Sequence, residues 1–291
     1  MSSHLKNFIE VTRLNRPIGF LLLFWPCAWG LSLGNYFRKD LNIFFYYLIL
    51  FFLGSVLMRS AGCIVNDIVD EKIDKKVFRT KKRPIASGSL SKKLAWVYVI
   101  ILCILAFFIL IQFNNLTIYL GIFSMIFAFS YPFMKRFTYW PQLFLGFTFN
   151  WGIIMAWTAM NNSINYLPIV LYFGAIFWTL GYDTIYGLQD ASEDEVIGVK
   201  STAIKFKKNL NIFLISCYLI SSILISFVIF KLGINYFTIF LIFFMFSLFY
   251  QIKIYDQKKP YSCLKAFRLN NISGFILFLA IFFTSSKNLW N

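Results

Sequence analysis

Long apolar runs separated by short polar breaks dominate the chain. Runs such as Ile43–Leu57 and Leu210–Phe230 contain very few charged residues. Apolar stretches that approach about 18 residues are long enough to cross a lipid bilayer as helices. Hydropathy predicts nine spans, near residues 17–34, 42–65, 94–113, 116–134, 141–160, 166–187, 209–230, 233–252 and 271–287. The pattern therefore predicts an all-α, polytopic membrane protein.

Composition supports a membrane protein over a soluble helical one. The 291 residues are 59% hydrophobic and 21% aromatic, and only 14% are charged, whereas a soluble domain has about 25% charged residues. A soluble bundle also needs polar helix faces, which these runs lack. We expect an interfacial cytoplasmic segment at residues 1–16, because its apolar positions have helical spacing. A single transmembrane domain is predicted at residues 17–291.

The net charge of +16 follows the predicted topology. A basic excess can indicate nucleic-acid binding, but 23 of the 28 Lys and Arg residues lie before the first span or in the loops after spans 2, 4, 6 and 8. The opposite side has four, namely Arg38, Lys39, Lys231 and Lys287, and Arg59 lies within the second span. This asymmetry favours the basic loops in the cytoplasm and a bacterial inner membrane location. It also argues for membrane lipid, and against nucleic acid, as the surrounding partner.

Cysteine and histidine offer little chemistry in this chain. The five cysteines form no CxxC pair, so we predict neither a zinc site nor a disulfide framework. The single histidine is His4, near the N-terminal end. The most common general base and metal ligand is therefore excluded from a site between the spans.

The acidic residues are concentrated in two short windows. Nine of the twelve Asp and Glu residues lie at the ends of spans 2 and 6, both on the predicted cytoplasmic side. The first window has Asp67, Asp70, Glu71 and Asp74, and the second has Asp183, Asp190, Glu193, Asp194 and Glu195. Simple charge balance among the loops would spread acids more evenly, so the clustering indicates a site.

Spacing within the windows indicates metal and phosphate chemistry. Asn66, Asp70 and Asp74 are four residues apart and would share one face of a helix. Asp183, Asp190 and Asp194 follow the same logic, at intervals of seven and four residues. Aligned carboxylates repel one another, and a divalent cation removes that repulsion. Mg²⁺ takes one or two carboxylates and completes its shell with water and substrate phosphate. Neighbouring cations would serve the remaining phosphate oxygens, and they include Arg79, Lys135 and Lys200.

Five stretches resemble those of a known family. They are residues 66–74, of the form NDxxDxxxD, residues 183–202, the run at 79–88, the stretch 13–26 with its Arg-Pro-Ile-Gly sequence, and the Tyr-Pro-Phe-Met-Lys-Arg sequence at 131–136. Together these resemble the membrane-embedded aromatic prenyltransferases, in particular the 4-hydroxybenzoate polyprenyltransferase branch. The resemblance implies a bundle of nine transmembrane helices around a central cavity. It also implies transfer of a polyprenyl group from polyprenyl diphosphate to 4-hydroxybenzoate, ortho to the hydroxyl, in ubiquinone biosynthesis.

The two acidic windows and this resemblance together assign roles to particular residues. One Mg²⁺ is expected at Asp67, Asp70 and Asp74, and a second at Asp190 and Asp194. Asp183, another carboxylate or the diphosphate itself would take the ring proton. Substrate contacts are predicted for Asn66, Arg79, Tyr131, Lys135, Arg136 and Lys200. Relatives often carry a basic residue at the position of Glu71, so Arg136 or Lys72 is the better candidate here for the aromatic carboxylate.

Two other function classes fit parts of the pattern. The acceptor could be another aromatic or a tetrapyrrole, with the same prenyl chemistry. A secondary transporter for a phosphorylated ligand is a different class, but transporters place their charged sites near the bilayer midplane. The acids of this chain lie at helix ends, which favours an enzyme.

Overall fold

The protein is helical throughout the part that its structure describes. The computed structural model describes residues 3–285, and no strand occurs among them. The elements in chain order are α1 (Ser3–Thr12), α2 (Ile18–Arg38), α3 (Leu41–Asp74), α4 (Lys92–Leu110), α5 (Asn115–Phe137), α6 (Pro141–Asn150), α7 (Gly152–Asn161), α8 (Tyr166–Gly187), α9 (Ala191–Ile197), α10 (Thr202–Lys205), α11 (Leu210–Leu232), the 3-10 turn η1 (Tyr236–Thr238), α12 (Ile239–Ile254) and α13 (Pro260–Ser285). Within residues 3–285, nine segments are long and apolar enough to cross a membrane, which confirms a nine-span bundle.

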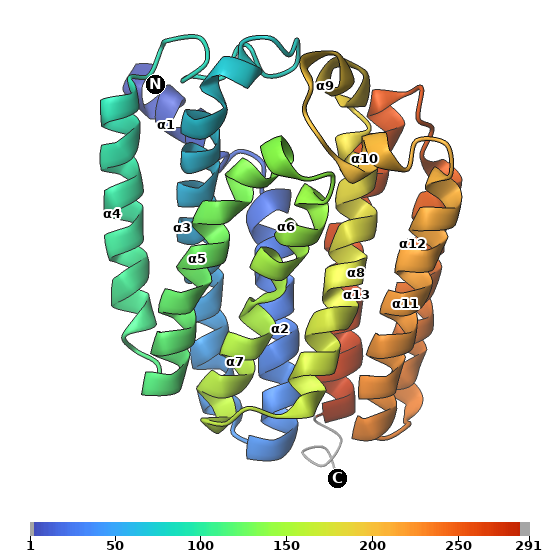
Figure 1. Ribbon diagram of the computed structural model, residues 1–291. Helices are drawn as coiled ribbons and strands as arrows, with labels where there is room; N and C mark the ends of the chain where they lie inside the picture. The colour runs from blue at the N-terminus through green and yellow to red at the C-terminus, as the bar shows by residue number, and fades with distance from the viewer. Residues whose placement is uncertain (1–2, 286–291) are drawn as a thin grey trace.

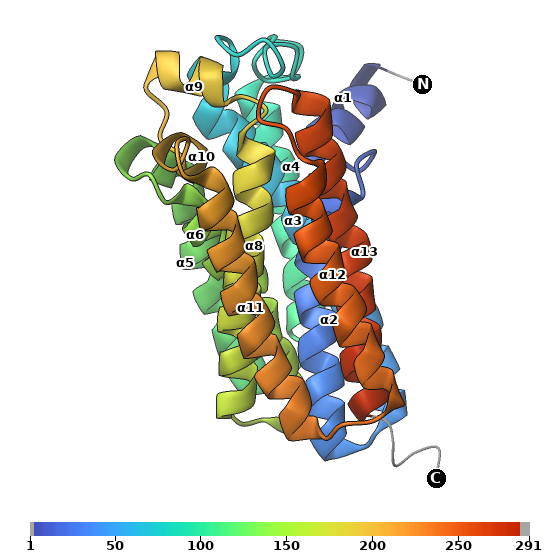
Figure 2. The ribbon, with the colours of Figure 1, turned by 90° about the vertical axis from the view of Figure 1, so that its right-hand side faces the viewer.

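The long helices run side by side, and the short elements gather at one end of the bundle (Figure 1). This end carries α1, the long connection between α3 and α4, and the short helices α9 and α10. Figure 2, turned by 90°, shows the same separation, with tight connections at the other end. The basic loops predicted on one side of the membrane therefore all lie at one end of the molecule.

Short polar residues start several of the spans. Asp40, Ser91 and Asn114 each accept a hydrogen bond from a backbone N–H in the first turn of the helix that follows. A side-chain oxygen at this position satisfies a donor that has no partner within the helix. Asn162 ends α7 in the left-handed conformation, with φ of 49°, which is a common way for a helix to terminate.

The centre of the bundle is formed by α2, α7, α8 and α13. The rings of Trp29 and Trp178 are fully buried there, with centroids 5.0 Å apart. At Gly30 of α2, an added Cβ would lie 2.4 Å from the carbonyl oxygen of Ile153 in α7. Small residues let membrane helices approach closely, so Gly30 fixes how α2 and α7 pack beneath the site.

Three spans differ from the hydropathy prediction. The second span continues as one helix to Asp74, past the predicted end at residue 65, because a helix satisfies its own backbone outside the bilayer and polar side chains do not end it. The fifth is divided at Trp151 into α6 and α7. The last begins at Pro260, so Lys265 and Arg268 lie on a helix and not in a loop. The predicted end at residue 287 lies outside the described residues.

Candidate active site

A cavity of about 1240 Å³ occupies the interior of the bundle and reaches the end that carries α9. Most of the residues predicted for the site line it, and they come from both acidic windows. The lining includes Asn66, Asp70, Asp74, Arg79, Tyr131, Lys135, Asp183, Asp190, Asp194 and Lys200. The tertiary structure thus brings together residues separated by more than a hundred positions in the chain.

The first acidic window occupies the last turns of α3 and presents one face to the cavity. Asn66, Asp70 and Asp74 lie on this face, as their spacing predicted. Asp67 lies to the side of it and is 2% exposed. Its Oδ1 accepts hydrogen bonds from Arg13 Nη2 at 2.6 Å and Arg83 Nη1 at 3.1 Å. The role of Asp67 as a metal ligand stays a prediction, and this geometry gives it a second possible role in holding two arginines.

Asp70 is the most deeply buried carboxylate of the window, with no exposed surface. Its Oδ2 is ion-paired with Lys135 of α5. Its Oδ1 is buried and has no hydrogen-bond partner among residues 3–285, with Arg136 Nη2 still 3.8 Å away. A buried carboxylate oxygen without a hydrogen bond is costly, so a cation bound beside Asp70 would relieve this cost.

The second acidic window is not one continuous helical face, which corrects the prediction from spacing. Helix α8 ends at Gly187, and Asp190 lies in the turn before α9. Asp190 Oδ1 accepts a 2.8 Å hydrogen bond from Arg79 Nε, and the same guanidinium donates to the Tyr186 hydroxyl at 3.2 Å. This arginine therefore connects the α3–α4 loop to the second window.

Asp194 and Glu193 are adjacent in sequence but face different surroundings. Burial and the neighbouring Asp190 carboxylate raise the pKa of Asp194 to about 6. Glu193 is exposed and accepts a 2.8 Å hydrogen bond from the backbone N–H of Phe78. Similarly, Glu71 of the first window pairs with Lys75 and Lys92 outside the cavity. In both windows, aspartates line the cavity, whereas Glu71 and Glu193 bind groups outside it.

The carboxylates fit a metal that is shared with a substrate. Among residues 3–285, no three Asp, Glu, Cys or His side chains lie close enough to hold an ion by themselves. Mg²⁺ often uses only one or two carboxylates, with phosphate and water as its other ligands. Asp70 Oδ1, which accepts no hydrogen bond within residues 3–285, and Asn66 in the same cavity wall match this need for a few hard oxygen ligands.

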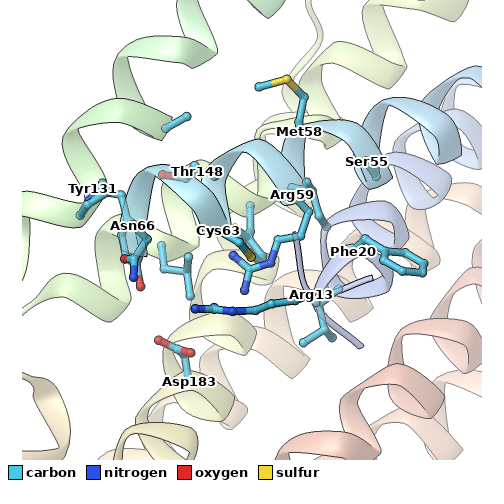
Figure 3. A pocket seen from close by; sticks show the side chains of 18 of the residues that line it. Arg13, Phe20, Ser55, Met58, Arg59, Cys63, Asn66, Tyr131, Thr148 and Asp183 are labelled. Carbon is cyan, nitrogen blue, oxygen red and sulfur yellow. The ribbon is translucent and has the colours of Figure 1, made fainter. Parts of the chain in front are cut away.

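Arg59 is a candidate functional residue to which the sequence pattern assigned no role. It lies within the apolar part of α3 and lines the cavity, and its Nε is buried without a hydrogen-bond partner in the described chain. Its guanidinium lies over the Phe149 ring, 5.1 Å from the centroid. Figure 3 shows Arg59 and Arg13 reaching into one space, with Asp183 across from them. A charge inside an apolar span is a recognised signal of function, and this signal was present in the sequence.

Arg136 and Lys72 lie outside this space. Both line a separate, smaller hollow of about 470 Å³ on the other side of α3. Arg136 Nη2 donates to the Val69 carbonyl oxygen at 2.6 Å. The structure therefore does not bring the two predicted carboxylate-binding residues into the main cavity, whereas it does bring Arg59 there.

Comparisons with known proteins agree with this fold and site. Residues 23–282 match the UbiA prenyltransferase family. A 4-hydroxybenzoate octaprenyltransferase of Psychromonas ingrahamii is 41% identical over 277 residues, covering 94% of this chain and 95% of the relative. One of Blochmanniella pennsylvanica is 40% identical over 286 residues, covering 94% of both chains. The chain therefore belongs to the UbiA prenyltransferase family, the membrane-embedded class that its fold and its two acidic windows indicated.

Solved structures share the fold at lower sequence identity. A UbiA homolog from Aeropyrum pernix superposes with a TM-score of 0.75 at 22% identity, covering 90% of this chain and 96% of that one. A homolog from Archaeoglobus fulgidus, bound to GPP and Mg²⁺, gives a TM-score of 0.69 at 18% identity, covering 96% and 99%. At these identities the likeness establishes the arrangement of the helices.

Proposed function

We propose that this protein transfers a polyprenyl group from polyprenyl diphosphate to 4-hydroxybenzoate, in ubiquinone biosynthesis. The observation that carries the proposal is the convergence of both acidic windows on one end of a long intramembrane cavity. A substrate with a charged diphosphate and an apolar tail needs such an end and such a cavity. The relatives that match nearly the whole chain are named for this reaction.

Mg²⁺ is the proposed cofactor, and five cavity-facing side chains would hold it. Asn66, Asp70 and Asp74 would serve one ion, and Asp190 and Asp194 a second. When bound, Mg²⁺ offsets the negative charge of the diphosphate and of these carboxylates.

Several cationic side chains are placed to bind the diphosphate once the carboxylates with which they pair bind Mg²⁺ instead. Lys135, Arg79 and Arg83 line the cavity and are ion-paired with Asp70, Asp190 and Asp74. Positively charged donors bind phosphate oxygens strongly. These side chains would then stabilise the charge that develops as the allylic C–O bond breaks and its electron pair leaves with diphosphate.

We assign the acceptor's carboxylate to Arg59. Its guanidinium lines the cavity, and its Nε has no hydrogen-bond partner among the described residues. Arginine is suited to binding planar carboxylates. An acceptor held here would turn its ring carbon ortho to the hydroxyl towards the allylic carbon of the donor. The new C–C bond forms as the ring carbon attacks, and the ring then loses its proton to Asp183, which borders the same space.

The walls around this space protect an electron-poor allylic carbon from water. Tyr131, Tyr182, Tyr186 and Phe149 all line the cavity. Aromatic faces attract cations, and an enclosed site excludes water that would otherwise hydrolyse the donor. We also propose a bacterial inner membrane location with the acidic windows facing the cytoplasm, from the distribution of Lys and Arg.

Purified protein, a prenyl diphosphate, 4-hydroxybenzoate and Mg²⁺ provide the test. The expected result is equimolar release of diphosphate and formation of ring-prenylated product, identified by mass spectrometry. Benzoate should not react, because it lacks the hydroxyl that supplies electron density to the ring. Product formation only with a different aromatic compound or a tetrapyrrole would identify a different acceptor. Uptake of ligand into proteoliposomes without release of diphosphate would favour a transporter.

A further inference from the structure

The smaller hollow, on the other side of α3 from the main cavity, has no role in the proposed prenyl transfer. Its volume of about 470 Å³ is within the usual range for small-molecule sites. It is bordered by the ends of α3, α5 and α9 and by the start of α4. Figure 1 shows α3, α4 and α5 next to one another at one side of the bundle. The smaller hollow therefore lies at the same end of the molecule as the acidic windows, but at the outside of the bundle.

Four cations from three helices line the smaller hollow. They are Lys72 of α3, Lys92 of α4, and Lys135 and Arg136 of α5. Glu71 is the one acidic residue that the described part of the chain contributes to the lining. Four positive charges and one negative charge leave the lining with a net charge of +3. An anion bound among these side chains would offset their mutual repulsion.

Two of the four cations are available to such an anion. Lys92 and Lys135 are each ion-paired with a carboxylate. Lys72 is exposed, and its ammonium has no ion pair or hydrogen bond among residues 3–285. Arg136 Nη2 donates to a backbone carbonyl oxygen and is 3.8 Å from Asp70 Oδ1, which is beyond hydrogen-bond distance. The other two nitrogens of this guanidinium have no hydrogen-bond partner in the described chain.

An exposed apolar stripe on α5 ends at the smaller hollow. Ile126, Phe129 and Phe133 are exposed and follow one another at intervals of three and four residues, and Arg136 continues the series. Residues at these intervals lie on one side of a helix. The Arg136 guanidinium lies over the Phe133 ring, 5.8 Å from its centroid. A hydrocarbon chain that lies along this stripe would therefore bring its polar end to Arg136.

A second exposed apolar stripe leads away from the hollow on α4. Lys92 begins this helix, and Trp96, Ile100 and Ile104 follow it at intervals of four residues. All three of these apolar side chains are exposed. The hollow thus has a cation above an apolar stripe on each of two helices, which suits a ligand that has an anionic head and apolar chains.

We propose that the smaller hollow binds the headgroup of an anionic phospholipid, with Lys72 and Arg136 as its phosphate-binding residues. The acyl chains would lie along the exposed stripes of α4 and α5. Basic pockets between membrane helices are suited to anionic lipid headgroups. A soluble phosphate would contact the same cations, but it would gain nothing from the two stripes. This inference does not depend on prenyl transfer, because the transfer is assigned to the main cavity.

The experiment measures lipid binding to the purified full-length protein in detergent by native mass spectrometry. Phosphatidylglycerol is compared with phosphatidylcholine that has the same acyl chains, so only the headgroup differs. The variant is Lys72→Gln/Arg136→Gln. The matched control is Lys76→Gln/Lys208→Gln, which removes the same charge from exposed residues at the same end of the bundle that do not line the smaller hollow.

The wild type should bind phosphatidylglycerol in preference to phosphatidylcholine. One cation near a membrane surface changes the affinity for an anionic lipid about fivefold, so the double variant should bind phosphatidylglycerol roughly 25-fold more weakly. The control pair should stay within about threefold of the wild type, because screening weakens more distant charges. Equimolar inorganic phosphate should displace little of the bound lipid, because it lacks the acyl chains.

Three results would overturn the inference. Equal loss in the variant and the control would indicate attraction to the basic surface as a whole. Equal binding of the two lipids would show that the negative charge of the headgroup is not recognised. Displacement of the lipid by equimolar inorganic phosphate would indicate a site for soluble phosphate. Thermal unfolding controls for folding, and if the double variant does not fold, Lys72→Gln alone decides, where unchanged binding of phosphatidylglycerol also overturns the inference.

Discussion

Arg13 Nη2 lies 2.6 Å from Asp67 Oδ1, so the segment after α1 is tied directly to the first acidic window. Arg13 lines the cavity, whereas Asp67 lies behind the face formed by Asn66, Asp70 and Asp74. Asp67 also holds Arg83. One carboxylate therefore positions two guanidinium groups that face the diphosphate end of the cavity.

This geometry separates the roles of Asp67 and Asp70. Asp70→Asn should reduce turnover by roughly 10²–10³, because it removes an electrostatic contact from a water-poor site, and added Mg²⁺ should restore part of it. Asp67→Asn should mainly raise KM for the prenyl donor, because its two arginines lose their anchor, and added Mg²⁺ should have little effect. Turnover of both variants across a Mg²⁺ titration is the measurement. A strong rescue of Asp67→Asn by Mg²⁺ would support its role as a metal ligand instead.

The second window offers a matched pair of adjacent carboxylates. Asp194→Asn should abolish most turnover, since Asp194 lines the cavity and is a proposed Mg²⁺ ligand. Glu193→Gln should change turnover by less than about threefold, because this exposed side chain accepts from the Phe78 backbone and does not line the cavity. Thermal unfolding in detergent controls for folding. Equal loss in both variants would argue against a metal site at Asp194.

Arg59 and Arg136 are alternative candidates for the residue that binds the aromatic carboxylate. Arg59→Gln should raise KM for 4-hydroxybenzoate by about tenfold or more, since it removes a charge-assisted contact inside the membrane. Arg136→Ala should leave that KM nearly unchanged, because Arg136 lies at the separate hollow. Initial rates at saturating donor provide both values. A larger rise in this KM for Arg136→Ala than for Arg59→Gln would support Arg136 as the partner and place the acceptor on the other side of α3.

Membrane orientation can be tested with introduced cysteines. Asn162→Cys should react with a membrane-impermeant thiol reagent in intact spheroplasts, and Lys208→Cys should react only after lysis. Both positions are exposed and lie at opposite ends of the bundle, and the charge distribution predicts that the α7–α8 connection faces outside. Four of the five native cysteines are buried, and the parent protein gives the background. Labelling of Lys208→Cys in intact spheroplasts would reverse the orientation.

The amino-acid sequence alone determined the class of fold and the one-sided distribution of charge, and it predicted many of the side chains that line the cavity. Bilayer spans depend on local hydropathy, and the spacing of Asn66, Asp70 and Asp74 follows from the helical repeat. These are short-range properties, so they could be predicted. The motifs that resemble the prenyltransferase family also predicted the reaction from the sequence.

Only the tertiary structure decided which side chains meet. The pairing of Arg79 with Asp190, the anchoring of Arg13 by Asp67 and the placement of Arg59 opposite Asp183 all join segments that are distant in the chain. Helical spacing shows which residues share a face, but the neighbour of that face is set by packing between helices. This is why spacing alone predicted one helical face for the second acidic window. It is also why the sequence could not show that Arg59 lines the main cavity and Arg136 does not.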